Sequence, residues 1–348
     1  MQQCPLRAAP SLTGGVAVAR RQEGMAVISA LLIVAFVTVV AASLTQRQAT
    51  LLRSVQAEQA RGQAHWLLRG GLDWARGVLQ ADAQRGPVTH LGGDWARPIL
   101  RSRFGSENPR LVGTFSGRLH DEQAKFNLRN VVRQGKVSTE DVEMFGRLCA
   151  QLGIDAALAS RIVQRVVMAH PRGQSQETER DDAEAEDDAA EGGDGREGRA
   201  TLALPEVAQA PMIRVLEDLL PLDGMSAGVL ESLRPYVTVL PANTAININT
   251  APARVLAAAI PDLTVTQAQA LTDERDAGQW FRNRGDLVNR LRRLDIGISR
   301  VRMSAFSQWF RLSSVATLDQ ATVPMQALIQ RQRSPRAVPR VVWLREGA

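Results

Sequence analysis

The first pattern along the chain is an uninterrupted apolar run. Residues 25–46 contain no charged residue, proline or glycine, and eleven of these 22 residues are Leu, Ile, Val or Phe. A helix of this length rises about 33 Å, close to the roughly 30 Å hydrocarbon thickness of a bilayer. The pattern therefore predicts a transmembrane helix.

The helical pattern continues beyond the apolar run. From residue 45 to about residue 83 there is no proline, and apolar residues recur every three or four positions, as in an amphipathic helix. We expect one continuous helix, with residues 47–85 as its amphipathic continuation. Trp66 and Trp74, together with Trp309, are expected to pack in a core or between helix and sheet. Four glycines mark close packing or a bend: Gly62, Gly70, Gly71 and Gly77.

Alternation of apolar and polar residues replaces the helical spacing after Pro87. It predicts strands over residues 111–119, 305–312, 325–331 and 338–344. These strands are expected to form a small antiparallel sheet that packs on the long helix. Residues 86–119 and 301–346 are therefore assigned to one β-sheet.

The intervening residues 120–300 carry mainly helical patterns. Asn249 or Thr250 is expected to cap a helix that starts near Pro252, while Ile246 and Ile248 point into the core. Further helices are expected over residues 138–152, 155–170, 267–277 and 285–294, with short ones within 205–222.

Composition argues against a self-contained enzyme. Two cysteines exclude a disulfide-rich scaffold, and neither a nucleophile elbow, a P-loop nor a GxGxxG turn occurs. Cys149 is expected to be a buried helical thiol. The only place where acid–base groups crowd together is His120-Asp121-Glu122, which we interpret as a surface turn.

The charge of the chain is unevenly distributed. The formal net charge is +6, but residues 177–197 hold eleven acids and two arginines, so the remainder is strongly basic. The segment 174–200 is interpreted as an acidic, self-repelling flexible loop. The alternative is a calcium site, since clustered carboxylates suit a hard cation, although the EF-hand spacing is absent.

The residues before the apolar run indicate its orientation and processing. Arg7, Arg20 and Arg21 precede it, so the positive-inside rule places the N-terminus in the cytoplasm. A basic leader that ends in glycine and leads into a long apolar helix resembles type IV pilins and pseudopilins. The resemblance implies that residues 1–24 are a prepilin leader, cut by a prepilin peptidase between Gly24 and Met25, with methylation of the new N-terminus. The alternative is a plain membrane anchor.

The fifth residue after this cut departs from the usual pseudopilin pattern. Most pseudopilins have glutamate there, whereas this chain has Ser29. An unpaired carboxylate in hydrocarbon costs about 2.5–3.5 kcal/mol, so it requires a partner. A subunit with nothing above it needs no such carboxylate. Ser29 therefore fits a fibre-tip subunit, and the resemblance narrows to the minor pseudopilin K family of type II secretion systems.

Two further motifs carry this resemblance. Residues 120–130, HDEQAKFNLRN, are similar to the family signature DEQ-x-x-(F/I)-N-L-N, and residues 245–252, AININTAP, to I-N-(L/V)-N-T-A-P. We interpret them as the starts of two related helix–hairpin–helix-like halves of one α-domain; chance similarity is the alternative. The motif residues are Asp121, Glu122, Gln123, Asn127, Asn247, Asn249 and Thr250.

The resemblance implies an α+β fold. The long N-terminal transmembrane and amphipathic helix packs on a small antiparallel sheet, which is the pseudopilin fold, and residues 120–300 form a large inserted α-helical domain. Calcium binding is associated with the family, but no ligand can be assigned in this sequence.

The same resemblance implies assembly rather than catalysis. The chain would lie in the bacterial inner membrane with a periplasmic body, at the tip of a pseudopilus that helps to export folded proteins. Expected partners are minor pseudopilins I and J, the major pseudopilin and the prepilin peptidase. The helix face that joins them is expected to include Val27, Leu31, Leu32 and Val34.

Two other functions are weighed against this one. Helix–hairpin–helix modules bind DNA phosphates through a glycine-rich hairpin, but here the hairpin contains Pro261 and Asp262, which lack a donor and repel phosphate, respectively. No nucleic acid is therefore expected as a partner. A secreted enzyme would require signal-peptidase cleavage near Ala42, yet the apolar run is longer than the roughly 7–15 residues of a secretory signal.

Overall fold

The computed structural model describes residues 23–104, 113–172, 203–292, 301–318, 321–334 and 336–347. The expected leader, except for its last two residues, and the whole acidic loop lie outside the described residues. The chain divides into two compact units, Met1–Gln59 and Ala60–Ala348.

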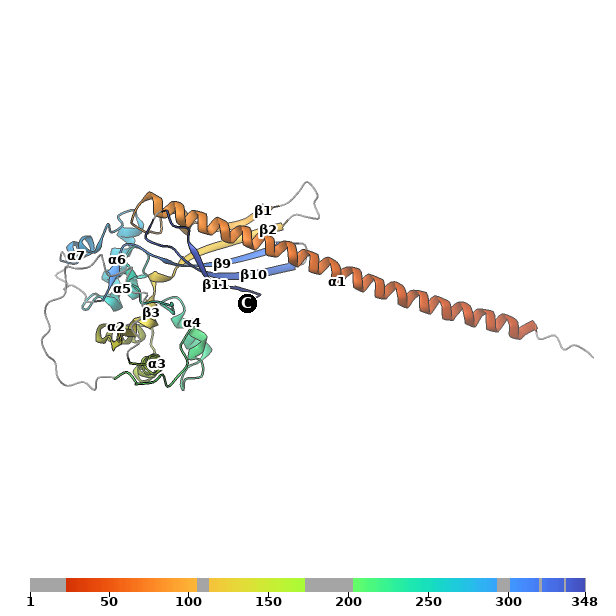
Figure 1. Ribbon diagram of the computed structural model, residues 1–348, viewed down its shortest axis with the longest axis horizontal. Helices are drawn as coiled ribbons and strands as arrows, with labels where there is room; N and C mark the ends of the chain where they lie inside the picture. The colour runs from red at the N-terminus through yellow and green to blue at the C-terminus, as the bar shows by residue number, and fades with distance from the viewer. Residues whose placement is uncertain are drawn as a thin grey trace, which may run out of the picture. The chain divides into compact units, whose positions relative to one another are not determined.

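Helix α1 (Glu23–Arg85) begins in the first unit and ends in the second. The predicted continuous helix is thus confirmed (Figure 1). Among the described residues, it is the helix that is long and apolar enough to cross a membrane. Its hydroxyl groups are satisfied locally: Thr38 and Ser43 donate to the backbone carbonyls of Ala35 and Val40, both at 2.8 Å. Such bonds let polar side chains reside in an apolar helix.

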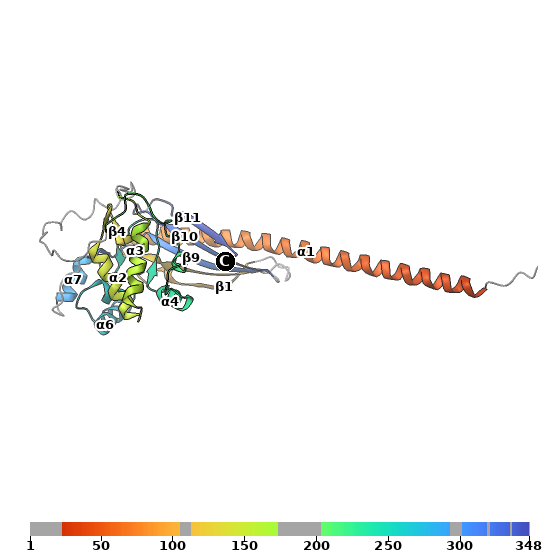
Figure 2. The same cartoon turned by 90° about the horizontal axis from the view of Figure 1, so that it is seen from below.

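The second unit is built on a five-stranded antiparallel sheet with the order β1-β2-β9-β10-β11. Figures 1 and 2 show the part of α1 that belongs to the second unit running along this sheet. The strands are β1 (Ile99–Phe104), β2 (Gly113–Asp121), β9 (Trp309–Leu318), β10 (Ala321–Gln330) and β11 (Arg340–Glu346). The expected sheet is confirmed, with strand ends shifted by several residues.

Strand β1 was not predicted from the sequence. Its register shifts between Ile99 and Ser102, and Arg101 has a φ of 46°. A bulge of this kind interrupts the alternation of faces, so the strand shows no clear period-two pattern.

The second half of α1 packs on one face of the sheet. From the helix, Ala64, Leu68, Leu72, Ala75 and Leu79 are buried against sheet residues that include Phe115, Phe310 and Leu312. Gly71 lies against Phe115, where an added Cβ would come within 2.2 Å of the ring, whereas Gly70 faces open space. Close packing is thus the role of Gly71.

The three tryptophans differ in how far they are buried. Trp309 is buried in a small core cluster with Leu240 and Leu328, and Trp74 is partly buried against the helix–sheet core, as predicted. The prediction for Trp66 is wrong, because its side chain is 73% exposed with Arg69 over its ring. Trp66 lies two positions from both Ala64 and Leu68, which are buried against the sheet. Two positions turn an α-helix by about 200°, so Trp66 is on the face away from the sheet.

An α-helical region is inserted between β2 and β9. It contains α2 (Thr139–Gln151), α3 (Ala156–Met168), α4 (Ala227–Leu233), α5 (Ala253–Ala259), α6 (Val265–Asp276) and α7 (Arg284–Arg292). The predicted helices at α2, α3, α6 and α7 are confirmed within a few residues. The short helices expected over 205–222 are mostly wrong, since only Leu216–Leu219 forms a 3₁₀ turn there.

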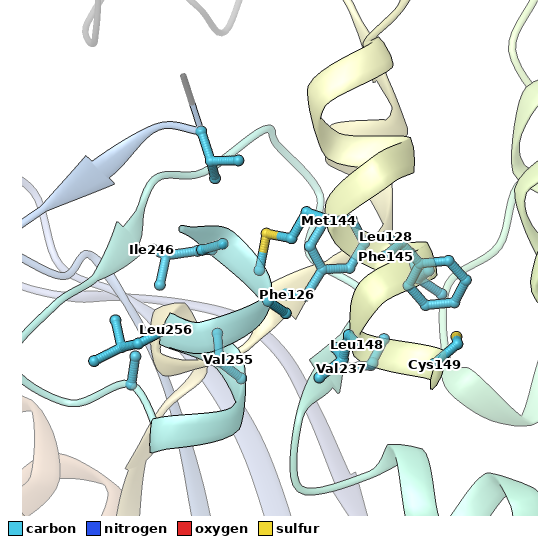
Figure 3. Packing of buried hydrophobic residues seen from close by; sticks show 14 of the residues in the cluster. Phe126, Leu128, Met144, Phe145, Leu148, Cys149, Val237, Ile246, Val255 and Leu256 are labelled. Atoms are coloured by element: carbon cyan, nitrogen blue, oxygen red, sulfur yellow. The ribbon is translucent and has the colours of Figure 1, made fainter. Parts of the chain in front are cut away.

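This region has its own hydrophobic core. Figure 3 shows Met144, Phe145 and Leu148 of α2 meeting Phe126 and Val237. The rings of Phe126 and Phe145 stack with centroids 5.4 Å apart. Cys149 is buried in the same cluster, as predicted, and burial raises the pKa of its thiol to about 12. A protonated thiol in this setting behaves as a small apolar side chain.

The contact of Gly71 with Phe115 predicts opposite effects for two neighbouring substitutions. Gly71→Ala should lower the free energy of unfolding by about 1–3 kcal/mol, because the added methyl group displaces the ring. Gly70→Ala is the matched control and should raise it by about 0.5–1 kcal/mol through helix propensity alone. Urea unfolding of the full chain in detergent micelles, followed by tryptophan fluorescence, measures both. Equal effects at the two positions would contradict this packing.

Candidate functional site

Asp121 is the centre of a buried polar junction between the sheet and the helical region. It ends β2 and is 5% exposed. Its Oδ2 atom accepts hydrogen bonds from the hydroxyls of Ser307 and Thr250, both at 2.6 Å, and from the Asn247 amide at 3.1 Å. One carboxylate thus joins three segments that are distant in sequence.

The next two motif residues extend this junction. Gln123 donates to the carbonyl of Ala245 at 2.9 Å and accepts from the backbone N–H groups of Gln308 and Trp309 at 2.6 and 3.2 Å. Glu122 accepts from the Thr238 hydroxyl at 2.6 Å. It also pairs with Lys125 and with Arg311, whose Nε lies 3.1 Å from its Oε1.

The interpretation of His120-Asp121-Glu122 as a surface turn is therefore wrong. Asp121 and Glu122 are buried and His120 is half-buried. Strand β2 runs on through Asp121 and a 3₁₀ turn, Glu122–Ala124, follows it into the interior. Buried carboxylates persist where donors surround them. Those donors come from segments more than 110 positions away, which a local pattern does not reveal.

The asparagines of the first motif hold the segment that precedes the second motif. Asn127 accepts from the backbone N–H of Leu240 at 3.1 Å and donates to the Ala242 carbonyl at 2.8 Å. Asn130 makes a reciprocal pair of bonds with the backbone of Thr244, at 2.8 and 2.9 Å. The motif therefore fixes the backbone by side-chain amides in place of a regular strand pair.

The polar side chains of the second motif are also fully engaged in hydrogen bonds. Asn249 bonds both the N–H and the carbonyl of Phe281, at 2.7 and 2.8 Å. The expected capping role is wrong, because Pro252 is the residue that precedes α5 and neither Asn249 nor Thr250 caps the helix. Ile246 and Ile248 are buried, as predicted.

The two motifs share a local construction. Asn127 and Asn247 each end a two-residue parallel strand pairing, β3 (Phe126–Asn127) with β6 (Val237–Thr238) and β7 (Ile246–Asn247) with β8 (Met303–Ser304). Each amide oxygen accepts from the N–H two residues later. The interpretation as two related halves stays a hypothesis, now with a geometric basis.

The helical hairpins after each motif also turn alike. Gly153, between α2 and α3, and Asp262, between α5 and α6, both have positive φ, 70° and 64°. In the second hairpin, Thr264 accepts from the Gln267 N–H, and the Gln267 side chain accepts from the N–H of Thr264. These donors are therefore engaged within the chain, and Asp262 adds a negative charge, which disfavours a phosphate at this hairpin.

A buried arginine completes the junction and was missed by the sequence reasoning. Arg331 is 1% exposed and pairs with Asp82 of α1 at 2.7 Å. It also donates to the carbonyl of Ser307 at 2.8 Å and to the hydroxyl of Thr89. Met325, Ala327 and Ile329 point to the core. Arg331 is the next residue in this alternation, so its position in the sequence could have predicted a buried charge.

The electrostatics suit a structural role. Burial raises the pKa of Asp121, opposed by hydrogen bonds from Ser307 and Thr250. For Glu122, burial acts in the same direction, but the charges of Lys125 and Arg311 prevail and lower its pKa. Both carboxylates are engaged by protein donors, so this arrangement joins distant segments of the chain.

The described residues do not supply a calcium site. Among them, no group of three or more His, Cys, Asp or Glu side chains is arranged to hold a metal ion. The acidic segment 177–197 lies outside the described residues.

The helix face expected to bind partners is open. Val27, Leu31, Leu32 and Val34 are 59–66% exposed in the single chain. Ser29 is also exposed, and Gly24 and Met25 belong to the first turn of α1. An apolar helix surface of this kind is suited to lipid and to packing against other helices.

Comparisons with known proteins agree on one family. Models described as "Type II secretion system (T2SS), protein K" match residues 124–242 and 246–307, which include residues 124–130 of the first motif and 246–252 of the second. The chain is 29% identical over 320 residues to type II secretion system protein K of Pseudomonas aeruginosa, covering 90% of each chain. It is 28% identical to that of Klebsiella pneumoniae, covering 90% of this chain and 93% of the relative.

A solved structure has the same fold. The chain is similar to a chain in the crystal structure of the GspK-GspI-GspJ complex from enterotoxigenic Escherichia coli, with a TM-score of 0.54 and 22% identity. The similarity covers 84% of this chain and 99% of that one.

The hydrogen bonds to Asp121 predict a large loss of stability on truncation. Asp121→Ala removes the acceptor of the Ser307 and Thr250 hydroxyls and of the Gln123 N–H, and it should lower the free energy of unfolding by about 3–5 kcal/mol. Asp121→Asn retains one acceptor oxygen and should cost less. The exposed Asp223→Ala is the control and should change stability by less than about 0.5 kcal/mol. Urea unfolding of the full chain in micelles measures all three, and equal stability of Asp121→Ala and the control would refute this role.

Proposed function

Since this chain belongs to the type II secretion system protein K family, we propose that it is a minor pseudopilin at the tip of the type II secretion pseudopilus. In that position it takes part in pseudopilus assembly and in the export of folded proteins across the outer membrane. One combination of features carries the proposal. An apolar helix is long enough to cross a membrane, and its second half packs on a sheet. A helical domain is inserted between two adjacent strands of that sheet.

Ser29 supports the tip position. A subunit inside a helical fibre has a neighbour whose N-terminal amine can pair with a carboxylate, and burying that carboxylate without a partner is costly. With serine at this position, the chain needs no amine from a subunit above it. The inserted domain adds bulk at the sheet, which would hinder the addition of a further subunit.

The proposed partners are the other minor pseudopilins. The similar Escherichia coli structure contains GspK with GspI and GspJ, so we assign the corresponding proteins to this chain, together with the major pseudopilin. Val27, Leu31, Leu32 and Val34 form the proposed contact face. Helices in lipid associate through close side-chain packing, since the surrounding acyl chains are equally apolar.

The proposed location follows from the charge around α1. The basic leader stays in the cytoplasm, α1 anchors the protein in the inner membrane, and the sheet and helical domain lie in the periplasm. A prepilin peptidase removes the leader after Gly24. The protein acts by assembly, without a catalytic step of its own, because the clustered carboxylates of the motif are committed to structural hydrogen bonds.

Processing gives a direct test of the proposal. The mature protein from membranes should begin at Met25, with the mass of a methylated N-terminus, and this form should disappear without an active prepilin peptidase. Gly24→Val should block the cut because a bulky side chain obstructs the protease at that backbone. Gly15→Val, in the same leader, is the control and should be cut normally. Intact mass spectrometry measures this; a start near Ser43, or an uncut Met1, would contradict it.

The helix face provides a second test. Leu31→Ala combined with Val34→Ala removes methyl groups from the proposed face and should reduce co-purification with the partner pseudopilins by about tenfold, or about 1.4 kcal/mol. Ile33→Ala combined with Val40→Ala removes similar groups from the opposite side and serves as control. Recovery of partners in mild detergent, quantified against total membrane protein, measures the effect. Equal recovery with both pairs would exclude this face.

A further inference from the structure

The sheet face that points away from α1 is strongly basic. We call it the outer sheet face and define it by two rows of paired residues. One row is Arg118, Ser313, Gln326 and Arg345, and the next is His120, Arg311, Leu328 and Trp343. The inward-facing alternates of the same strands, such as Phe310, Leu312 and Ala327, pack on α1. Alternation in a strand therefore places three arginines on the outer side.

The helical domain adds further cations along one border of this face. A groove there is lined by Arg311, Leu328, Trp343 and Arg345 from the sheet. Opposite them lie Lys125, Arg214, Leu216 and Arg234 from the helical domain. Arg118, Arg214 and Arg345 are exposed, while Lys125 is mostly buried. The groove thus combines charged rims with apolar walls.

The acids near the groove do not balance these cations. Glu122 is already paired with both Lys125 and Arg311, while Glu217 and Glu231 pair with Arg234. Among the described residues, none forms an ion pair with Arg118, Arg214 or Arg345. The neighbouring Glu346 points to the other side of the sheet and contacts His65. A net positive charge therefore remains on the outer sheet face.

The titration of His120 is consistent with this field. Its pKa is lowered to about 4, first by burial and then by the charge of Arg311. Glu122 raises it, and Lys125 and Arg118 lower it by smaller amounts. Cations that disfavour a further positive charge equally favour an incoming negative one.

The composition of the surface favours a protein ligand. Arginine and tryptophan are enriched in protein interfaces, where an apolar pocket anchors one side chain and charges at the rim select the partner. Arginine also binds carboxylates in a bidentate manner. The row between Arg118 and Arg345 also supplies uncharged hydrogen-bonding groups, from Ser313 and Gln326. A phosphate backbone would use evenly spaced cations and has no use for the apolar wall of Leu328 and Trp343.

We propose that the outer sheet face binds a carboxylate-rich segment of a partner protein, with acidic side chains at Arg118 and Arg345 and an apolar side chain in the groove beside Trp343. This contact is separate from the membrane helix face and goes beyond the proposed function. It gives the periplasmic part of the protein a docking surface of its own, selected by charge.

Binding of a labelled peptide to the full chain in uncharged detergent micelles tests the proposal. The probe is a fluorescein-labelled peptide rich in Glu and Leu, and a second peptide has every Glu replaced by Gln. Fluorescence anisotropy should show salt-sensitive binding of the acidic peptide alone. Arg118→Glu combined with Arg345→Glu should weaken it at least about tenfold, through like-charge repulsion. Gln326→Lys adds a cation in the same row and should tighten it.

The control is a charge reversal elsewhere. Arg282→Glu combined with Arg172→Glu alters two exposed arginines outside the outer sheet face and should leave the affinity within about twofold. Equal weakening by both pairs of substitutions would show that binding depends only on the net charge of the protein, and this result would overturn the proposal. Preferential binding of duplex DNA or anionic lipid vesicles, lost in the same Arg118/Arg345 variant, would assign the surface to another ligand and also overturn it.

Discussion

The structure depends on one requirement, that three buried charged groups meet their hydrogen-bonding partners at a single place. Asp121 accepts from Ser307, and the carbonyl of Ser307 accepts from Arg331, whose guanidinium pairs with Asp82 of α1. Each of these groups would be costly to bury alone. They are satisfied together only when α1, the sheet and the inserted helical domain adopt one mutual arrangement. The hydrogen bonds of the family motif and of Arg331 therefore hold these parts of the second unit together.

The same requirement explains which features the sequence revealed. Local patterns identified α1, the strands β2, β9, β10 and β11, and four further helices. Helical spacing and strand alternation depend only on residues that are close together in the sequence. The resemblance of residues 120–130 and 245–252 singled out residues that meet in the structure, since Asp121 bonds Asn247 and Thr250. It did not reveal their environment, so Asp121 and Glu122 were placed on the surface although their partners bury them.

The misses have a common physical cause. Thr250 looked like a helix cap because hydroxyl residues often precede helices, but Asp121, far away in sequence, takes its hydroxyl. Trp66 looked like a core residue because it is large and aromatic, yet its position on α1 turns it away from the sheet. Arg331 occupies an inward position that a period-two pattern normally gives to an apolar residue. In each case, long-range pairing overrode a preference that is correct on average.

The place of the inserted domain has a consequence for how the protein folds. Strands β2 and β9 are paired neighbours, yet their junction bond from Ser307 to Asp121 closes a separation of 186 residues. Closing so long a loop costs chain entropy, and the cost falls if the intervening segment is already compact. The helical domain has a hydrophobic core of its own. It should therefore form first and bring the two ends together, so that the sheet is completed last.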